Sequence, residues 1–180
     1  MKLLFLGLAF GIVSSFVNQV AVTENVTKQK APDLEVSLAA DKNTYKPGDR
    51  IKLEVLLVNN NAVKDIFVYG TLQFGVRASF TLFRRDSNGK EVPTRFIDDA
   101  WELPPKSNDI GAFVKLLPFH FLGTTYKSSI HFLNMERSGK YTMWVEYHSP
   151  ISTANVEVSP FWGKENGTIK SNVVEIEVLP

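Results

Sequence analysis

The chain has 180 residues, of which 44% are hydrophobic and 22% are charged, and its formal net charge is +1. This balance is ordinary for a folded globular chain and argues against disorder. The basic residues are scattered, so nucleic-acid binding has no electrostatic basis, and the pair Arg84–Arg85 is predicted to be a solvated strand end. The sequence contains no cysteine, which excludes disulfides, thiol catalysis and cysteine-based zinc sites.

The N-terminal segment has the order of a secretory signal peptide. Lys2 precedes an apolar run, residues 3–17, in which the small residues Ser14 and Ser15 mark a cleavage zone. A membrane-spanning helix needs about 20 apolar residues, so an uncleaved membrane anchor is the weaker alternative. We therefore expect residues 1–21 to be a signal peptide that is cut between residues 15 and 21. The chain would then be exported and would keep no stable membrane span after cleavage.

Residues 22–32 are polar, lack periodicity and end in Pro32, which predicts a flexible linker. The remaining residues, 33–180, are numerous enough to bury a core and predict a single domain. Many small extracellular domains depend on disulfides, whereas this one must be held together by packing alone.

From residue 33 onward, apolar and polar side chains alternate, as they do on half-buried β-strands. The alternating segments are residues 34–38, 51–57, 78–82, 129–132, 141–148 and 174–178, with a further strand expected at 112–121. Turn signals occur at Lys46–Asp49, which contains Pro-Gly, and at Asp86–Gly89, which contains Asn-Gly. No segment of the domain shows helical periodicity. The sequence therefore predicts an all-β fold, an antiparallel sandwich of about seven to nine strands.

Two motifs carry a resemblance to a known architecture. Residues 45–49, YKPGD, match the Y-x-P-G-D turn that leads into the second strand of many bacterial exported immunoglobulin-like, arrestin-like and macroglobulin-like domains, and Asn59 follows that strand. Tyr141 stands two residues before Met143, as a tyrosine does before the second core position of strand F in immunoglobulin-like domains. Residues 33–180 thus resemble a bacterial exported immunoglobulin-like β-sandwich domain, which implies no single function. A weaker likeness connects the chain to small proteinase-inhibitor domains of bacilli.

The titratable residues form no recognised catalytic or metal-binding motif. His120, His131 and His148 lie far apart in the sequence and lack the short spacings of metal ligands. Asp98 and Asp99 are the densest acidic point, but adjacent residues of a strand face opposite sides, so a solvated loop is the simpler interpretation. The sequence also lacks nucleophile, phosphate-loop and metalloprotease motifs. We therefore expect no catalysis, no metal site and no cofactor.

The connection between the last two predicted strands carries large aromatic side chains. These either anchor a partner or fold back over the open end of the sandwich. If every strand runs antiparallel to the one before, this connection shares an end of the domain with an asparagine run, where immunoglobulin-type domains carry binding loops. The candidate partner-binding residues are therefore Phe161, Trp162, Asn59, Asn60 and Asn61.

The sequence predicts an exported, non-catalytic binding or structural module, periplasmic or extracellular, whose partner is an unidentified protein or glycan. One alternative is a secreted proteinase inhibitor, for which Lys115–Leu122 or Pro104–Pro105 would supply the inhibitory loop. Another is a glycan-binding or glycan-acting protein that uses the region of Asp98 and Asp99, with His120.

Overall fold

The computed structural model describes residues 33–75, 79–93 and 109–180, and all of them belong to one compact unit, residues 31–180. Several predicted features lie outside the described ranges, namely the signal peptide 1–21, the linker 22–32, Ala78, Asp98, Asp99 and Pro104–Pro105. Within the described ranges, no helix is long and apolar enough to cross a bilayer.

The described residues contain ten strands and three short 3-10 helices. The strands are β1 (Leu34–Ala40), β2 (Thr44–Tyr45), β3 (Arg50–Asn59), β4 (Ile66–Tyr69), β5 (Phe80–Arg85), β6 (Phe113–Leu116), β7 (Phe121–Ser129), β8 (Gly139–His148), β9 (Thr168–Lys170) and β10 (Val174–Val178). The 3-10 helices are η1 (Ile110–Ala112), η2 (Thr153–Asn155) and η3 (Lys164–Asn166). The fold is therefore all-β in the part of the chain that the structure describes.

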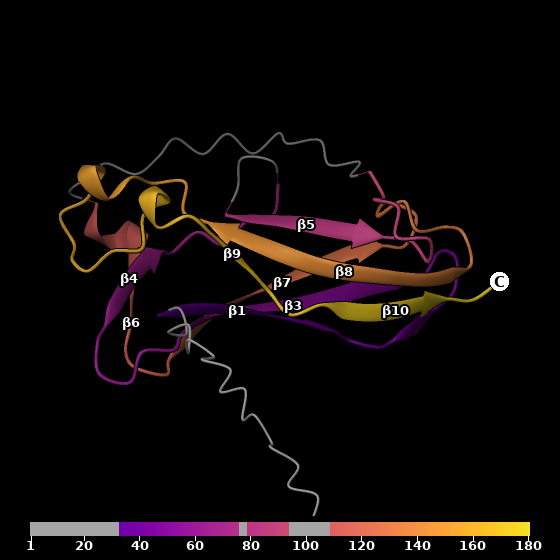
Figure 1. Ribbon diagram of the computed structural model, residues 1–180, viewed down its shortest axis with the longest axis horizontal. Coiled ribbons are helices and arrows are strands. Elements are labelled where there is room, and N and C mark those ends of the chain that lie inside the picture. Colours follow the sequence, from indigo (N-terminus) through magenta and orange to yellow (C-terminus); the bar gives the residue numbers. More distant parts are fainter. Residues whose placement is uncertain (1–32, 76–78, 94–108) are drawn as a thin grey trace, which may run out of the picture. The chain divides into compact units, whose positions relative to one another are not determined.

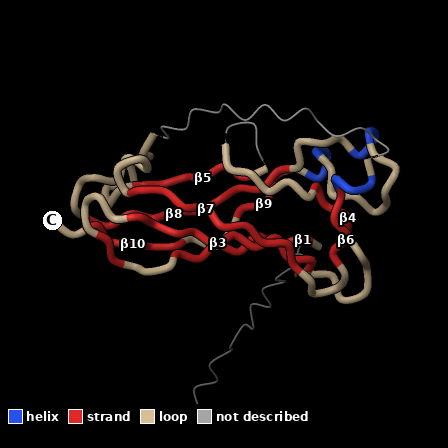
Figure 2. Tube along the Cα trace, turned by 180° about the vertical axis from the view of Figure 1, so that it is seen from behind, coloured by secondary structure: helices blue, strands red, loops and turns tan. Residues whose placement is uncertain are grey.

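The strands form two larger sheets and one small ribbon (Figures 1 and 2). The first sheet has the order β1–β3–β7, and the second has the order β2–β10–β8–β5, with β9 also paired to β8. β4 and β6 pair with each other at one end of the long strands. Among the paired strands only β2 and β10 run parallel, so the predicted antiparallel arrangement is confirmed for the sheets.

Alternation places one face of each central strand in the core. Leu53 and Val55 of β3, and Met143 and Val145 of β8, are each 0% exposed. These four side chains belong to one hydrophobic cluster that takes residues from both larger sheets. Full burial of such a side chain contributes about 1.5–3 kcal/mol, which is how a chain without disulfides is stabilised.

Both predicted turns are present. In the first, the Asp49 amide donates to the Lys46 carbonyl (3.0 Å), and Gly48 adopts a φ of +88°. In the second, the Asp86 amide donates to the Lys90 carbonyl (2.9 Å), and Gly89 has a φ of +75°. A residue without Cβ takes this left-handed conformation without steric cost, so the local sequence alone specified these turns.

Two predicted strands were wrong in extent. The segment 129–132 is not a strand, because β7 ends at Ser129 and the chain turns immediately, with Ile130 buried from within that turn. The expected strand at 112–121 is interrupted by a turn after Leu116, so it becomes the end of η1, then β6, and then the first residue of β7. A turn that buries some of its apolar residues can show the same alternation of apolar and polar residues as a strand. The sequence pattern therefore predicted strands in these two segments where the chain turns.

The prediction for Arg84 was also wrong. Arg84 lies on the core face of β5 with 1% of its surface exposed, and its Nη2 donates to the Val92 carbonyl at 3.4 Å. Burial lowers the pKa of its guanidinium. Arg85 points the other way, and its guanidinium lies 5.0 Å from the centre of the Trp144 ring. The alternation of the strand decided the position of Arg84, and its charge did not.

Two tyrosines of β8 differ in how their hydroxyl groups are satisfied. Tyr141, 5% exposed, donates its hydroxyl to the Arg137 carbonyl at 2.8 Å. Tyr147 is fully buried, and within the described residues its hydroxyl has no hydrogen-bond partner. Burial raises the pKa of both phenols.

We expect the two Tyr→Phe substitutions to have different effects on stability. Tyr141→Phe removes a hydrogen bond that bridges the turn before β8 and should lower the free energy of unfolding by about 1 kcal/mol. Tyr147→Phe removes a buried hydroxyl that bonds to nothing described and should leave the stability unchanged or raise it. Urea denaturation of both variants measures the difference. Equal losses in the two variants would contradict this account.

Candidate functional site

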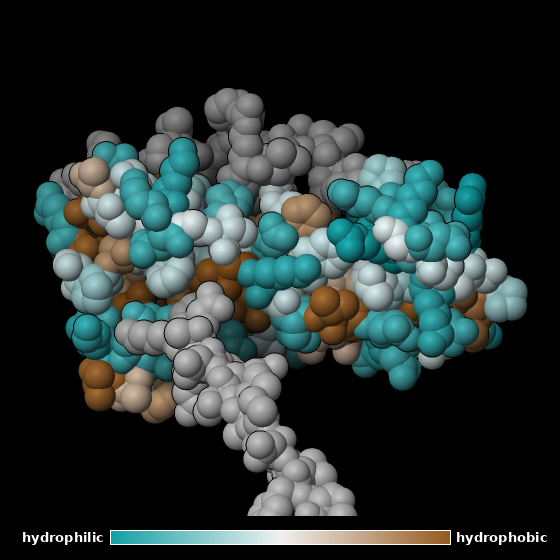
Figure 3. Space-filling model, in the orientation of Figure 1, coloured by the Kyte–Doolittle hydropathy of each residue, from teal (hydrophilic) through white to brown (hydrophobic). Residues whose placement is uncertain are grey.

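Four exposed apolar side chains gather at the end of the sheets that carries β4 and β6. Val63 is 80% exposed, Leu117 42%, Phe119 65% and Phe121 61%. We call this set the apolar tip. Hydrophobic atoms are visible at the surface of this end (Figure 3). Single exposed apolar residues are common on protein surfaces, but a cluster of large ones marks an interaction site.

The turn from Leu117 to His120 presents Phe119 in a strained conformation. The His120 amide donates to the Leu117 carbonyl at 3.0 Å, which makes Pro118 and Phe119 the two central residues of a β-turn. Phe119 has a φ of +59°, in the left-handed region. That position of a turn favours glycine or asparagine, and a bulky residue there costs about 1–3 kcal/mol. Phe119 is thus not the residue that would make this turn most stable.

Asn59, the last residue of β3, holds the turn in place from inside. It is 0% exposed, and its Nδ2 donates to the carbonyls of Lys64 (2.8 Å) and Leu116 (2.9 Å). Its backbone amide donates to the His120 carbonyl, and its carbonyl accepts from the Phe119 amide, both at 2.9 Å. One buried asparagine therefore fixes the turn that bears Phe119 and the neighbouring turn that bears Val63.

Asn61 organises the second turn. Its Oδ1 accepts from the amides of Val63 and Lys64, each at 3.0 Å, which is an asparagine-stabilised turn. Its amide donates to the Asn59 Oδ1 at 3.0 Å, and its Nδ2 donates to the Asp33 Oδ1 at 3.0 Å. The tip is therefore held in place by side-chain hydrogen bonds within the domain.

The predicted asparagine run thus divides by role. Asn59 is buried and Asn61 is half-buried, and both use their side chains to support the tip, so the partner-binding assignment does not hold for Asn59. Asn60 is exposed at the same end, beside the tip. The run marks a pair of tight turns at the end of the domain that carries the tip, because asparagines favour such turns. The aromatic run at residues 117–121, LPFHF, was the signal in the sequence that could have identified the tip itself.

The aromatic pair Phe161 and Trp162 covers the end of the sheets. Phe161 is 8% exposed, and its ring lies edge-on to that of Phe113, with 5.3 Å between ring centres. The segment pairs with β4, because the Trp162 amide donates to the Phe67 carbonyl and the Phe67 amide to the Pro160 carbonyl, both at 2.8 Å. Trp162 is half-buried against the main core. Phe161 therefore folds back over the end of the sheets, as one of the two interpretations from the sequence had it, and little of its side chain is exposed to a partner.

Glu165 in η3 ties this segment together. Its carboxylate accepts from the Ser152 hydroxyl, and also from the Thr153 amide (2.9 Å) and hydroxyl (3.1 Å). These hydrogen bonds, that from Ser152 first, lower the pKa of Glu165 to about 2. Since every donor stabilises the ionised form, the carboxylate is a structural clasp between η2 and η3.

The charges beside the tip nearly balance. Lys115 Nζ lies 3.2 Å from the Asp65 carboxylate and 5.4 Å from the centre of the Phe67 ring. Lys64 is exposed on the adjacent turn, and Asp33, just before β1, bonds the Asn61 side chain of that turn. The described residues that border the tip therefore carry charges of both signs.

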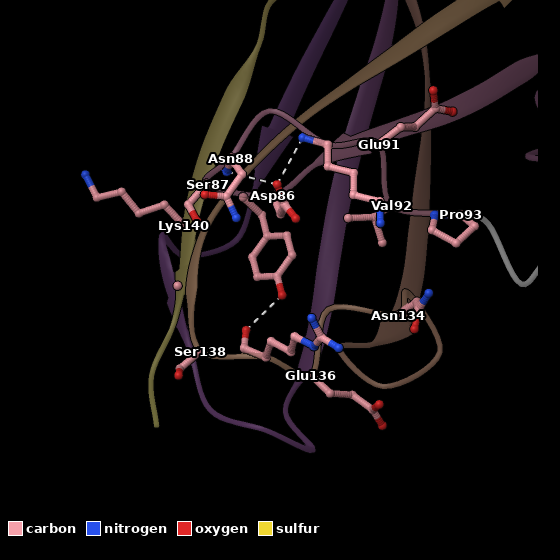
Figure 4. Close-up of a pocket in the computed structure, with 14 residues that line it drawn as sticks. Asp86, Ser87, Asn88, Glu91, Val92, Pro93, Asn134, Glu136, Ser138 and Lys140 are labelled. Carbon is pink, nitrogen blue, oxygen red and sulfur yellow. Dashed lines mark hydrogen bonds between the residues drawn. The ribbon is translucent and has the colours of Figure 1, made fainter.

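A polar groove of about 440 Å³ lies at the opposite end, between the Asp86–Gly89 turn and the segment before β8 (Figure 4). Charges of both signs line it, among them Glu91, Glu136 and Lys140. Asp86, its most central carboxylate, accepts from the amides of Asn88 (2.9 Å) and Lys90 (3.0 Å) and so serves its own turn.

The histidines do not come together. His120 is exposed in the tip turn, and the exposed His131 pairs with Glu136. Burial lowers the pKa of the half-buried His148, and the charge of Lys164 adds to this effect. In the described ranges, no group of three histidine or acidic residues could hold a metal ion.

No protein-family model and no curated protein matches the sequence. The solved structures that are distantly similar include the following three. The first is the sporulation control protein Spo0M from Bacillus subtilis, with 10% sequence identity and a TM-score of 0.41 over 83% of this chain and 50% of that one. The second is the CARDB domain of the PF1109 protein from Pyrococcus furiosus in complex with di-metal ions, with 14% identity and a TM-score of 0.37 over 82% of this chain and 89% of that one. The third is AvmM, which catalyses macrocyclization in alchivemycin A biosynthesis, with 9% identity and a TM-score of 0.39 over 82% of this chain and 89% of that one. This chain spans half the length of the Spo0M chain. Likenesses this distant assign no function.

The support of the tip by Asn59 can be tested against its exposed neighbour. Asn59→Leu removes the two side-chain donors and leaves the Lys64 and Leu116 carbonyls without them, so the free energy of unfolding should fall by about 1–3 kcal/mol. Asn60→Ala, at an exposed position, should change it by no more than about 0.5 kcal/mol. Urea denaturation gives both values, and amide hydrogen exchange at Phe119 should accelerate only in Asn59→Leu. A neutral Asn59→Leu would refute the supporting role.

The lowered pKa of Glu165 leads us to expect that the domain loses stability in acid. Its folded pKa lies below its unfolded value, so its contribution is present above about pH 5 and is lost as pH falls toward 2. The stability difference between the wild type and Glu165→Gln should therefore shrink over that window. Denaturation at a series of pH values measures this, and the NMR shift of the Thr153 amide should titrate in the wild type only. A difference that stays constant with pH would argue against the clasp.

Proposed function

We propose that the mature chain is an exported, non-catalytic binding module built on an immunoglobulin-like sandwich. The strand order supports the architecture, because β1, β3 and β7 lie in the order of strands A, B and E, and β10, β8 and β5 in that of G, F and C. The Tyr141 hydroxyl bond to the Arg137 carbonyl is of the kind found at the tyrosine corner of such domains. Export rests on the signal-peptide pattern of residues 1–21.

The apolar tip is the binding surface. The observation that carries this proposal is Phe119, which is 65% exposed and adopts a φ of +59°. An exposed phenyl ring gains the domain no burial, and the left-handed backbone adds strain. A side chain that stabilises neither the turn nor the core, on a turn fixed by Asn59, is explained by contact with a partner.

The geometry favours this function over a proteinase inhibitor with its loop at Lys115–Leu122, whereas the other candidate loop, Pro104–Pro105, lies outside the described residues. A protease cleft that adds its substrate as a β-strand takes an extended segment, whereas Lys115–Leu122 is folded back by the turn closed between Leu117 and His120. The glycan-acting alternative depends on Asp98 and Asp99, which lie outside the described residues. The binding function depends on described residues only.

Photo-crosslinking tests the binding surface even though the partner is unidentified. Benzoylphenylalanine replaces Phe119 in one version of the chain and Phe132, 44% exposed beyond the far end of β7, in the other. Irradiation of producing cells should give a defined adduct, a protein or a lipid, at position 119 and not at position 132. The two probes are matched because each replaces an exposed phenylalanine with a larger aromatic side chain.

The same experiment can reject the proposal. Identical adduct patterns at the two positions would mean that the tip is an ordinary surface, and so would the absence of any adduct at position 119. Circular dichroism of both labelled proteins should retain the β spectrum of the wild type, which excludes unfolding as the cause of either result.

A further inference from the structure

We propose that the open edge of β7 binds an extended, acidic segment of a partner protein as an added β-strand. The groups that would bind it are the backbone amides and carbonyls of Gly123, Thr125 and Lys127, which we call the β7 edge. This inference goes beyond the proposed function, because the β7 edge is separate from the apolar tip. It is carried by the direction of these backbone groups, by the cover on the other sheet edges and by the charge beside β7.

The backbone groups of the β7 edge point away from β3. The two strands pair as an antiparallel ladder, in which every second residue bonds to the residue opposite. At one end the Asn59 amide donates to the His120 carbonyl at 2.9 Å, and at the other the Ile130 amide donates to the Asp49 carbonyl at 3.0 Å. The residues of β7 that bond to β3 are therefore Leu122, Thr124, Tyr126 and Ser128. The β7 edge alternates with these, so its amides and carbonyls face the side on which a further strand would pair.

The domain's own segments cover part of the two other long sheet edges but leave the β7 edge open. At β5, the Gly75 amide donates to the Phe80 carbonyl at 3.0 Å. At β1, the Asn172 side chain accepts from the Leu38 amide (2.8 Å) and donates to the Leu38 carbonyl (2.9 Å). β7 has nine residues and pairs with β3 alone among the described strands. Native proteins usually block such an edge, so an open one of this length is a site for pairing with another chain.

Positive charge gathers on the outer face beside the β7 edge. Lys127 is exposed and lies directly opposite Lys52 in the ladder, and the exposed Arg50 precedes Lys52 on the same face of β3. Like charges placed opposite each other destabilise a sheet. Lys52 has acidic partners, because the Glu54 carboxylate accepts from its Nζ and raises its pKa, and Asp41 adds to this effect. Arg50 and Lys127 form no ion pair with any described residue, so an excess of positive charge remains there.

The partner strand should therefore alternate acidic and apolar side chains. A residue of the added strand directly opposite Lys127 shares its face, where a carboxylate would offset the like charges. The next residue of that strand would lie on the inner face beside Tyr126. The half-buried Tyr126 ring has its centre 4.7 Å from that of the Phe74 ring, and an apolar side chain fits beside this pair. A second copy of β7 would not supply the charge, since its sequence, FLGTTYKSS, has no acidic residue.

Peptides with methylated backbone nitrogens test strand addition directly. The parent peptide has blocked ends and alternates glutamate and valine. In an antiparallel pair, the glutamates opposite the β7 edge also donate their amides to it, whereas the valine amides point away. The isotope-labelled exported chain, with its natural N-terminus, is titrated with each peptide and followed by NMR. The parent should bind with a Kd below about 1 mM, shift the amides of Gly123, Thr125 and Lys127 and slow their hydrogen exchange.

Three altered peptides separate backbone pairing from charge. Methyl groups on the glutamate nitrogens should weaken binding about tenfold or more, because they remove the donors to β7. Methyl groups on the valine nitrogens are the matched control and should change the affinity far less. Lysine in place of every glutamate should abolish binding, since it adds like charge beside Lys127.

Variants of the chain test the same two contributions. Thr125→Pro removes an amide that faces away from β3, a position at which an edge strand accepts proline, and should weaken binding about tenfold or more. Lys127→Glu should weaken it about threefold or more. Lys90→Glu makes the same change of charge on the exposed turn after β5 and should leave the affinity unchanged. Circular dichroism should show the wild-type β spectrum in all three, and if Thr125→Pro unfolds, Lys127→Glu and the methylated peptides still decide.

Several results would contradict the inference. Absence of binding by the parent peptide would overturn it, and so would equal affinities for the two methylated peptides. Equal affinities of Lys127→Glu and Lys90→Glu would refute the acidic partner. A dimer of the free chain that Thr125→Pro dissociates would show instead that a second copy occupies the edge. None of these results depends on Phe119, so the tip and the β7 edge are tested independently.

Discussion

The burial of the inward faces of β3 and β8 in one core is the constraint on which the rest of the structure depends. The inward side chains of these two strands, Leu53 and Val55 from one and Met143 and Val145 from the other, are fully buried in the same cluster. β1 and β7 pair with β3, and β5, β9 and β10 pair with β8, so most described strands bond directly to one of the two. The chain has no cysteine, and this core therefore supplies the stability that disulfides supply in many exported domains.

The register of β3 carries that constraint out to the tip. Ile51 to Leu57 set which face of the strand is buried, and with the period of two Asn59 falls on the same inward face. There its side chain meets carbonyls of the two turns, a position that a slip of one residue would reverse. The position of the apolar tip thus depends on the core. The hydrophobic pattern sets the register of β3, the register places the Asn59 side chain inside, and that side chain holds the two turns.

The sequence correctly predicted the features that depend on neighbouring residues of the chain. The alternation in β1, β3, β8 and β10 and the turns at Gly48 and Gly89 were predicted correctly, because pleat and left-handed backbone leave direct traces in the sequence. The turn at Pro118–Phe119 was missed because a phenylalanine occupies a position that usually belongs to glycine. The burial of Arg84 was not predicted, and that of Phe161 was only one of two interpretations, since both depend on contacts with other segments, such as those of Val92 and Phe113. The asparagine run pointed to turns at one end of the domain, but the roles of its members became clear only from the carbonyls to which their side chains bond.

Phe119 lowers the stability of the domain in a way that the proposed binding function would explain. In a domain whose net stability is about 5–15 kcal/mol, an exposed ring on a left-handed backbone is a measurable cost, and a glycine would remove it. The surrounding structure shows that the turn is not loosely tolerated, since the Phe119 amide and the carbonyls on either side of the turn are bonded to Asn59. A strained residue that is held so firmly and projects its ring outward is preorganised for contact, because its ordering has been completed before a partner is met. Under the proposed function, the fixed geometry that is costly to the isolated domain is also what would favour binding at the tip.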